Sequence, residues 1–195
     1  MIKKFDFKCF SLALIIILFN NCATTGYKKM SIEDPETLLS IQDSLLIERP
    51  SNQIIIDALV NAHINVAEKY INKGDDASAA EHFKSASELN SFNNVSKYGL
   101  LISEGRLLVS KGNKNGIWDA IEKFSKASTL YPGNGEPFYL MAISYTKLGD
   151  TDFDLILESY EKALALELND KQRSEAEKKY EKAKERKKKL ETFWK

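Results

Sequence analysis

The sequence predicts an all-α solenoid, which is a stack of helix-turn-helix repeats that bury a shared core. Nine Gly and four Pro among 195 residues are fewer than average and leave few turns for an all-β fold. The apolar fraction of 43% is sufficient for a buried core. Three segments share an aromatic residue followed three positions later by Ala, a pair that shares one helix face. The pairs are Phe83/Ala86, Phe124/Ala127 and Tyr160/Ala163.

Charge balance and cysteine content exclude several classes of protein. The chain carries 28 basic and 28 acidic residues, so as a whole it has no field that would attract nucleic acid or an acidic membrane. Its two cysteines, Cys9 and Cys22, both lie near the N-terminus. We therefore expect neither a disulfide framework nor a Cys-rich metal site in what is one domain of ordinary size.

Residues 1–21 are predicted to be a signal peptide. Lys3, Lys4 and Lys8 precede an uncharged apolar run from Phe10 to Phe19, which ends at the polar pair Asn20-Asn21. A spanning helix needs about 20 apolar residues, so this run has the length of a signal-peptide apolar region. We exclude it from the fold.

Cys22, followed by Ala23-Thr24-Thr25-Gly26, resembles the end of a bacterial lipoprotein signal peptide. In that family the cysteine receives a diacylglycerol thioether and its new amino terminus is acylated, and several acyl chains make a stable anchor. The lipobox is of a relaxed type, because Asn21 stands where a small residue is usual. The resemblance implies a lipoprotein of the cell envelope, and the absence of Asp at position 23 favours the periplasmic side of the outer membrane. The alternative is that Cys22 is an ordinary residue after a general cleavage site or in an uncleaved anchor.

Residues 22–34 show no sustained apolar period and are predicted to be a tether. The solenoid is expected at 35–170. Its first part, Leu38 to Pro50, resembles the second helix of a degenerate repeat, since terminal repeats are commonly atypical.

The three repeats resemble the tetratricopeptide (TPR) family. That pattern has a small residue and Tyr in a first helix, Gly at the turn, Ala, an aromatic residue and Ala in a second helix, and Pro at the exit. The resemblance implies a TPR-like solenoid of about three repeats plus capping helices. Matching positions are Ala67, Tyr70, Gly74, Ala79, Phe83 and Ala86; Gly105, Gly112, Ala120, Phe124, Ala127 and Pro132; and Ala142, Tyr145, Gly149, Tyr160, Ala163 and Ala165.

Two departures from the family pattern predict local differences. Pro50, Ser91 and Pro132 are spaced by 41 residues, whereas the TPR period is about 34. The extra residues of the first interval precede Gly74, so the helix from Asn52 to Asn72 should be about two turns longer than usual. In the second interval, we expect the segment Lys111 to Gly116 to form a longer loop.

Residues 171–195 are predicted to be a basic C-terminal helix. They hold 11 basic and 5 acidic side chains, while residues 22–170 carry a net charge of −8. Ala176, Tyr180 and Ala183 follow a helical spacing and form a thin apolar stripe. We expect a helix that caps the last repeat; the alternative is a Lys-rich surface for anionic lipid or an acidic partner.

The sequence shows no motif for catalysis, a metal or a cofactor. The segment Gly112 to Gly116 lacks the ending of a phosphate-binding loop, and there is no Gly-x-Ser-x-Gly elbow. His63 and His82 fall on different predicted helices of one repeat, without metal-ligand spacing. We therefore expect a protein that is not an enzyme.

The TPR resemblance implies a partner-binding groove on the concave side, which the first helix of each repeat lines. Ile64 and Glu68 stand where the carboxylate-clamp version of the groove needs Lys and Asn, so chaperone C-terminal tails are disfavoured. A mixed lining suits an extended or helical segment of a partner. The alternative is that the N-terminal or C-terminal helix of the chain itself fills the groove. Candidate residues are Asn61, Ile64, Asn65, Glu68 and Asn72; Ile102, Arg106 and Ser110; and Tyr139, Ile143, Thr146 and Lys147.

These observations predict a lipid-anchored TPR adaptor or scaffold that mediates protein–protein interactions in the bacterial cell envelope. The alternative function is an accessory solute-binding or transporter-associated TPR lipoprotein, which would need a real cavity for a small molecule.

Overall fold

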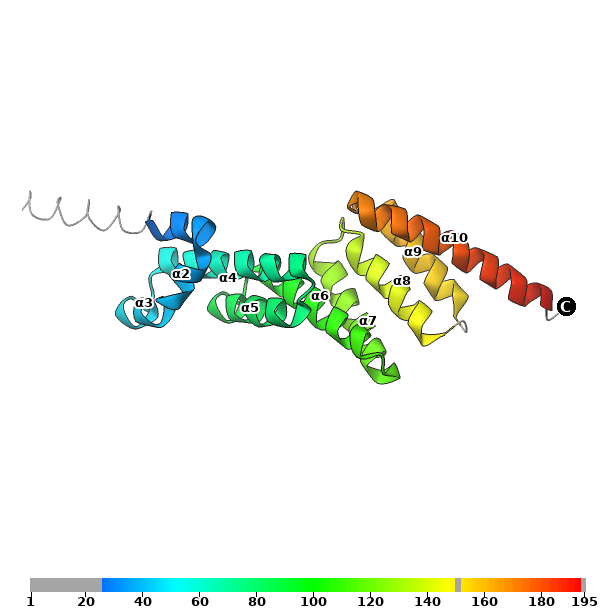
Figure 1. The fold of residues 1–195 in the computed structure, drawn as a ribbon, viewed down its shortest axis with the longest axis horizontal. Coiled ribbons are helices and arrows are strands. Elements are labelled where there is room, and N and C mark those ends of the chain that lie inside the picture. The colour runs from blue at the N-terminus through cyan, green and yellow to red at the C-terminus, as the bar shows by residue number, and fades with distance from the viewer. Residues whose placement is uncertain (1–25, 150–151, 194–195) are drawn as a thin grey trace, which may run out of the picture.

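The computed structural model describes residues 26–149 and 152–193, which form an elongated stack of helices (Figure 1). The predictions for residues 1–21 and Cys22 lie outside the described residues. Three helical hairpins follow one another, and further helices flank them at both ends. The elements are α2 (Pro35–Ser40), α3 (Gln42–Glu48), α4 (Gln53–Lys73), α5 (Asp76–Leu89), α6 (Asn94–Lys111), α7 (Lys114–Leu130), α8 (Glu136–Leu148), α9 (Phe153–Ala165) and α10 (Asp170–Phe193).

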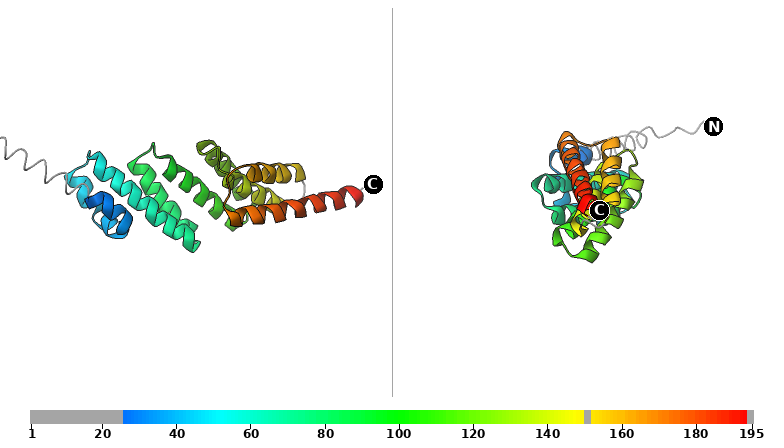
Figure 2. Two further views of the ribbon diagram at one scale, coloured as in Figure 1. Left: turned by 90° about the horizontal axis from the view of Figure 1, so that it is seen from above. Right: turned by 90° about the vertical axis from the view of Figure 1, so that its right-hand side faces the viewer.

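Each helix from α4 to α10 packs mainly against its neighbours along the chain. Viewed from above, the hairpins α4/α5, α6/α7 and α8/α9 lie in sequence along the long axis (Figure 2). Buried side chains of the described residues accordingly form a row of clusters along the stack. This is the quasi-one-dimensional packing of a solenoid. The predicted all-α, TPR-like fold of three repeats with capping helices is confirmed.

The repeated aromatic residues lie in the core, as predicted. Phe124 and Tyr160 are almost completely buried, and Phe83 is 5% exposed. On α6, Gly99 lies against the ring of Phe83 and Gly105 against the ring of Phe124, so closely that a Cβ at either glycine would overlap the ring. These glycines let α5 and α7 approach α6 from both sides.

The turns of the hairpins α4/α5 and α6/α7 are short because a glycine ends the first helix and a capping side chain starts the second. Gly74 and Gly112 adopt left-handed conformations with φ of 76° and 73°, which favour glycine. The Asn113 side chain accepts from the Gly116 amide at 2.7 Å and caps α7. The expectation of a long loop from Lys111 to Gly116 is therefore wrong, since α7 begins at Lys114 and absorbs the extra residues.

Helix α4 has 21 residues, against 13 in α8, which confirms the prediction of a longer first helix. Its additional turns bury Ile55 and Leu59 completely. These side chains join Leu38 and Leu45, from the short helices α2 and α3, in one cluster. The extra length of α4 therefore provides the surface on which the N-terminal cap packs.

The N-terminal region differs from the expected tether and single helix. Residues 26–33 are helical, and Tyr27 and Met30 pack against the cluster of α2, α3 and α4. Ser31 is fully buried. Tertiary contact orders this segment although its apolar period is short. Helices α2 and α3 are separate because the Ile41 amide donates to the Leu38 carbonyl at 3.3 Å, which tightens the end of α2.

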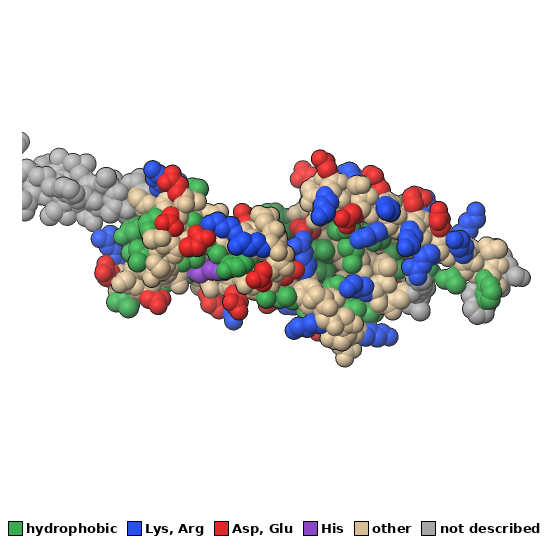
Figure 3. Space-filling model, viewed as in Figure 1, with side chains coloured by type: hydrophobic (Ala, Val, Ile, Leu, Met, Phe, Trp, Pro, Cys, Tyr) green, Lys and Arg blue, Asp and Glu red, His purple; other side chains and the backbone are tan. Residues whose placement is uncertain are grey.

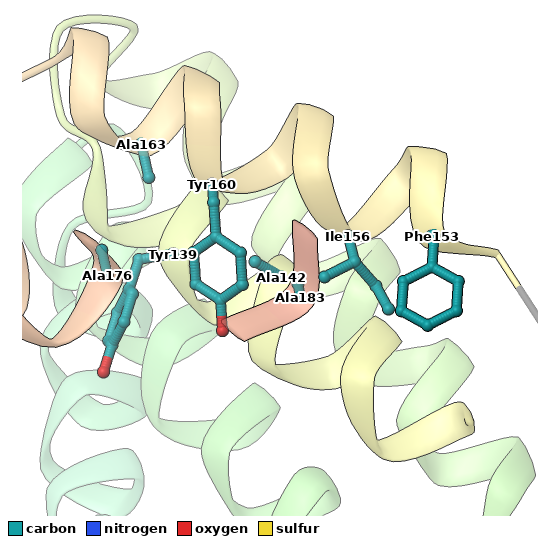
Figure 4. Close-up of a cluster of buried hydrophobic side chains, with 8 residues drawn as sticks. All are labelled: Tyr139, Ala142, Phe153, Ile156, Tyr160, Ala163, Ala176 and Ala183. Carbon is teal, nitrogen blue, oxygen red and sulfur yellow. The ribbon is translucent and has the colours of Figure 1, made fainter. Parts of the chain in front are cut away.

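Helix α10 caps the last repeat by packing on α9. Ala176 and Ala183 are buried in a cluster with Tyr139, Ile156 and Tyr160 (Figure 4). Since both buried residues on α10 are alanines, the helix can approach α9 closely. Among the described residues, no helix combines the length and apolar character needed to cross a membrane.

Candidate binding groove

A groove of about 320 Å³ opens between α4 and α6 and extends to the first turn of α8. Four residues predicted for the groove lie in its lining, namely Glu68, Asn72, Ile102 and Arg106. The lining consists of Glu68, Ile71, Asn72, Phe83, Val95, Tyr98, Gly99, Ile102, Arg106 and Glu136. The structure thus brings predicted residues of repeats one and two together.

The floor of this α4–α6 groove is apolar because the core of repeat one reaches the surface there. Phe83 packs across Gly99, and Ile102 is 4% exposed. Val95, on the first turn of α6, is 46% exposed and offers an apolar contact to solvent. A side chain of a partner can therefore bury apolar surface in the groove.

Carboxylates outnumber cations around the groove. Arg106 Nη2 donates to Glu136 Oε1 at 2.6 Å, and Arg106 Nη1 lies 3.6 Å from Asp76 Oδ1. Burial raises the pKa of Asp76 above its ordinary value, although Arg106 opposes this effect. Glu68 adds a third, exposed carboxylate on α4. Three acids thus surround the groove against one guanidinium, which pairs with two of them, and the groove favours a positively charged group of a partner.

Glu136 connects the groove to distant parts of the chain. Tyr98 Oη donates to Glu136 Oε2 at 2.8 Å, and Gln172 Nε2 donates to Glu136 Oε1 at 3.1 Å. Asn134 Nδ2 in turn donates to Tyr98 Oη at 2.9 Å. Burial, followed by the Glu136 charge, raises the pKa of Tyr98. Sequence reasoning missed Glu136 and Gln172, since nothing in their spacing marks either residue.

The two termini cover the ends of the predicted concave surface and leave the α4–α6 groove open. Asn65 Nδ2 donates to the Ser31 carbonyl at 2.7 Å, so the helical residues 26–33 occupy that position. At the other end, Tyr139 is 5% exposed and its hydroxyl donates to Glu175 Oε2 at 2.6 Å. The terminal helices therefore occupy the two ends of the predicted concave surface but not its middle, the α4–α6 groove.

The remaining predicted residues fall elsewhere. Ile64 is buried in the core cluster of repeat one, where no partner can reach it. Asn61 is exposed on α4 but does not line the α4–α6 groove, and Ser110 is exposed near the end of α6. Ile143, Thr146 and Lys147 line a second cavity, between α8 and α10.

His63 and His82, which the sequence places far apart, form a hydrogen-bonded pair with Nδ1 atoms 3.0 Å apart. His63 Nε2 lies 2.8 Å from Gln42 Oε1, which can only accept, so Nε2 carries the proton. His63 Nδ1 then accepts from His82 Nδ1–H. Burial, with a smaller contribution from the His82 charge, lowers the pKa of His63 to about 4. The pair ties α3, α4 and α5 together in the neutral form.

Within residues 26–149 and 152–193, no three His, Cys, Asp or Glu side chains are grouped so that they could hold a metal ion. The ionisable groups of the α4–α6 groove are engaged in hydrogen bonds or ion pairs with one another, apart from the exposed Glu68. Their arrangement suits recognition of a charged group by complementary charge.

Comparison with known proteins gives fold neighbours only. No family model matches the chain, and no curated protein matches it. A solved structure of MamA (AMB-1) shares 18% identity at a TM-score of 0.46 and covers 85% of this chain and 92% of its own. The structure of TTC0263, a thermophilic TPR protein of Thermus thermophilus, also shares 18% identity, with a TM-score of 0.41, and covers 88% of this chain and 94% of its own. At this distance the neighbours carry no argument about function, which must come from the surfaces described above.

Proposed function

We propose that this protein is a non-catalytic interaction scaffold that holds a segment of a partner protein in the α4–α6 groove. The observation that carries the proposal is the combination of an apolar floor with an excess of carboxylates in an open groove of about 320 Å³. The partner segment is extended or helical and presents a Lys or Arg next to an apolar side chain. The cation pairs with Glu68 and Glu136, while the apolar side chain packs on Val95 and Ile102.

A panel of fluorescent peptides tests this function. Peptides with paired basic and apolar residues are titrated against the protein and against the double variant Glu68→Lys/Val95→Ser. We expect binding to weaken at least about tenfold in the variant, because charge complementarity and apolar contact are both lost. Glu48→Lys, an exposed position on α3, is the charge-matched control and should bind normally. Equal affinity of acidic and basic peptides would contradict the proposal.

We further propose that the scaffold is anchored by lipid at Cys22 in the bacterial cell envelope, on the periplasmic side of the outer membrane. The support is the sequence itself: a basic start, the apolar run from Phe10 to Phe19 and the cysteine shortly after it. Two or more acyl chains would make the attachment stable.

Labelling with a radioactive fatty acid tests the anchor. The native protein should incorporate label and fractionate with membranes, whereas Cys22→Ser should do neither. Label in both forms, or in neither, would refute acylation at Cys22.

A second candidate function is that of an accessory solute-binding protein for a transporter. The observation that favours it is the cavity between α8 and α10, which lies apart from the α4–α6 groove.

A further inference from the structure

A second cavity, of about 240 Å³, lies between the end of α8, the start of α9 and the middle of α10. We call it the α8–α10 pocket. Half of its lining is apolar or aromatic, and the other half consists of four cationic side chains and one hydroxyl. The lining residues are Ile143, Thr146, Lys147, Phe153, Ile156, Tyr160, Lys179, Lys182, Ala183 and Arg186.

The pocket exists because α10 packs closely on α9 but diverges from α8. Near its start, α10 is held to α8 by the Glu175–Tyr139 and Gln172–Glu136 hydrogen bonds. Further along, the apolar group that α10 contributes to the lining is the methyl group of Ala183, while its other lining residues there are cationic. Figure 4 shows Phe153, Ile156 and Tyr160 on α9 with Ala183 on α10 nearby. The space between α8 and α10 therefore has an apolar floor without a side chain that fills it.

The charge around the pocket is strongly positive. Lys147, Lys179, Lys182 and Arg186 line it, and no lining residue is acidic. Lys179 Nζ lies 3.6 Å from Glu175 Oε2, which neutralises part of its charge. Lys147 Nζ donates to the uncharged Val109 carbonyl at 3.3 Å, and this contact leaves its positive charge in place. On the face seen in Figure 3, Lys and Arg side chains gather over α10, and hydrophobic side chains show beside them.

We propose that the α8–α10 pocket binds a small aliphatic carboxylate, of the medium-chain fatty acid class. The tail packs on Ile143, Phe153 and Ile156, and the carboxylate meets Lys147 and Lys182. The cavity is smaller than the roughly 300–1,000 Å³ of sites for drug-sized ligands, so its ligand is correspondingly small.

The polar groups of the pocket favour this ligand over a peptide segment. A peptide brings backbone amides that need partners. The Thr146 hydroxyl already donates to the Ala142 carbonyl at 2.8 Å, and the other polar side chains of the lining, except Tyr160, are cations that cannot accept. Tyr160 is itself 1% exposed. An aliphatic tail has no such need, and a carboxylate is the group that the cations Lys147 and Lys182 attract.

Isothermal titration of the full chain with octanoate tests the proposal, with butanoate, octanol and octylammonium as matched probes. We expect saturable octanoate binding, and an affinity that rises about fourfold for each methylene from butanoate to octanoate. Octanol should bind more weakly because it lacks the charge, and octylammonium more weakly still.

The double variant Lys147→Glu/Lys182→Glu should reduce octanoate affinity at least about tenfold. Both positions are exposed, so the fold should persist. Lys114→Glu, on the first turn of α7, is a control that leaves the pocket unchanged. Unchanged affinity in the double variant, or equal binding of octylammonium and octanoate, would overturn the proposal. The peptide affinity of the α4–α6 groove, measured on the same variants, should not change, so the two proposals can fail separately.

Discussion

The α4–α6 groove and the α8–α10 pocket are built from the same helix-turn-helix unit but carry opposite charge. Around the groove, three carboxylates outnumber the single cation Arg106, which pairs with two of them, Glu136 and Asp76. In the pocket, four cations surround an apolar floor without an acid in the lining. One solenoid can therefore offer two selective surfaces, because the repeats set the shape while residues outside the repeat pattern set the charge.

The two surfaces also differ in the elements that bound them. The groove is bounded by elements of adjacent repeats, whereas the pocket depends on α10, which stands beside α9 where the next first helix of a repeat would pack. A charge-rich capping helix thus creates the second surface. Substitutions should consequently affect the two regions to different degrees.

The largest effect is expected at the junction of the two regions. Phe124→Ala should lower the free energy of unfolding by about 3–5 kcal/mol, because the fully buried ring leaves a cavity. Urea denaturation measures the change. Trp118→Ala, on the same helix but with a 44% exposed ring, should cost about 1 kcal/mol or less. Equal effects of the two substitutions would contradict the assignment of Phe124 to the core between groove and pocket.

Acid should weaken the N-terminal region selectively. The folded pKa of His63 lies below its ordinary value of 6.5, at about 4, so the unfolded state binds more protons between these pH values. Its contribution to stability is complete above pH 6.5 and is lost as the pH falls toward 4, by about 1–3 kcal/mol.

Unfolding of the protein and of His63→Phe, measured across this pH range, tests the acid effect. The variant should show the shallower dependence on pH, and hydrogen exchange should report the opening in α3 to α5. The same slope in both proteins would refute the role of the histidine pair.

Gly105→Ala should destabilise the protein by about 1–3 kcal/mol, since a Cβ would overlap the Phe124 ring. Alanine is otherwise the better helix former by about 1 kcal/mol, so the sign of the effect is diagnostic. Gly26→Ala, where a Cβ has open space, is the control. Thermal unfolding measures the change. A higher melting temperature for Gly105→Ala would contradict the close packing of α6 against α7.

Glu136→Gln should cost about 1 kcal/mol, because its side chain and that of Arg106 are 19% and 26% exposed and solvent screens part of the pair. The substitution keeps an acceptor for Tyr98. A double-mutant cycle with Gln172→Ala measures how strongly the groove is coupled to α10. Strict additivity would mean that the two regions act independently.

Exposed charges should matter least for stability. Glu68→Lys should change the free energy of unfolding by no more than about 0.5 kcal/mol, although it reverses a charge at the groove. Chemical denaturation checks this limit. A larger loss would show that Glu68 supports the fold, and any effect on peptide binding would then be indirect.

Much of the fold was predictable because it depends on local pattern. The pairs Phe124/Ala127 and Tyr160/Ala163 mark the core face of their helices, and Gly74 and Gly112 mark turns that need a left-handed residue. The count of extra residues before Gly74 predicted the length of α4. The one loop prediction that failed, at Lys111 to Gly116, missed that Asn113 can cap a helix immediately after Gly112.

The candidate site was predictable only in part. Glu68, Asn72, Ile102 and Arg106 lie together because first helices of successive repeats share a face. Ile64 was misplaced, since a small rotation of α4 decides whether that position faces the groove or the core.

By itself, the sequence determined the helical repeats, their core faces and the excess of positive charge in the last segment, because all three are properties of residues near one another in the chain. Only the tertiary structure decided which parts of the concave surface stay open. Residues 26–33 cover Asn65, and α10 covers Tyr139, through contacts between segments that are distant in sequence. The same holds for the His63–His82 pair and for the divergence of α8 from α10. Periodicity defines which side of a helix is buried, but the rotation and docking of that helix depend on the shape of its neighbours.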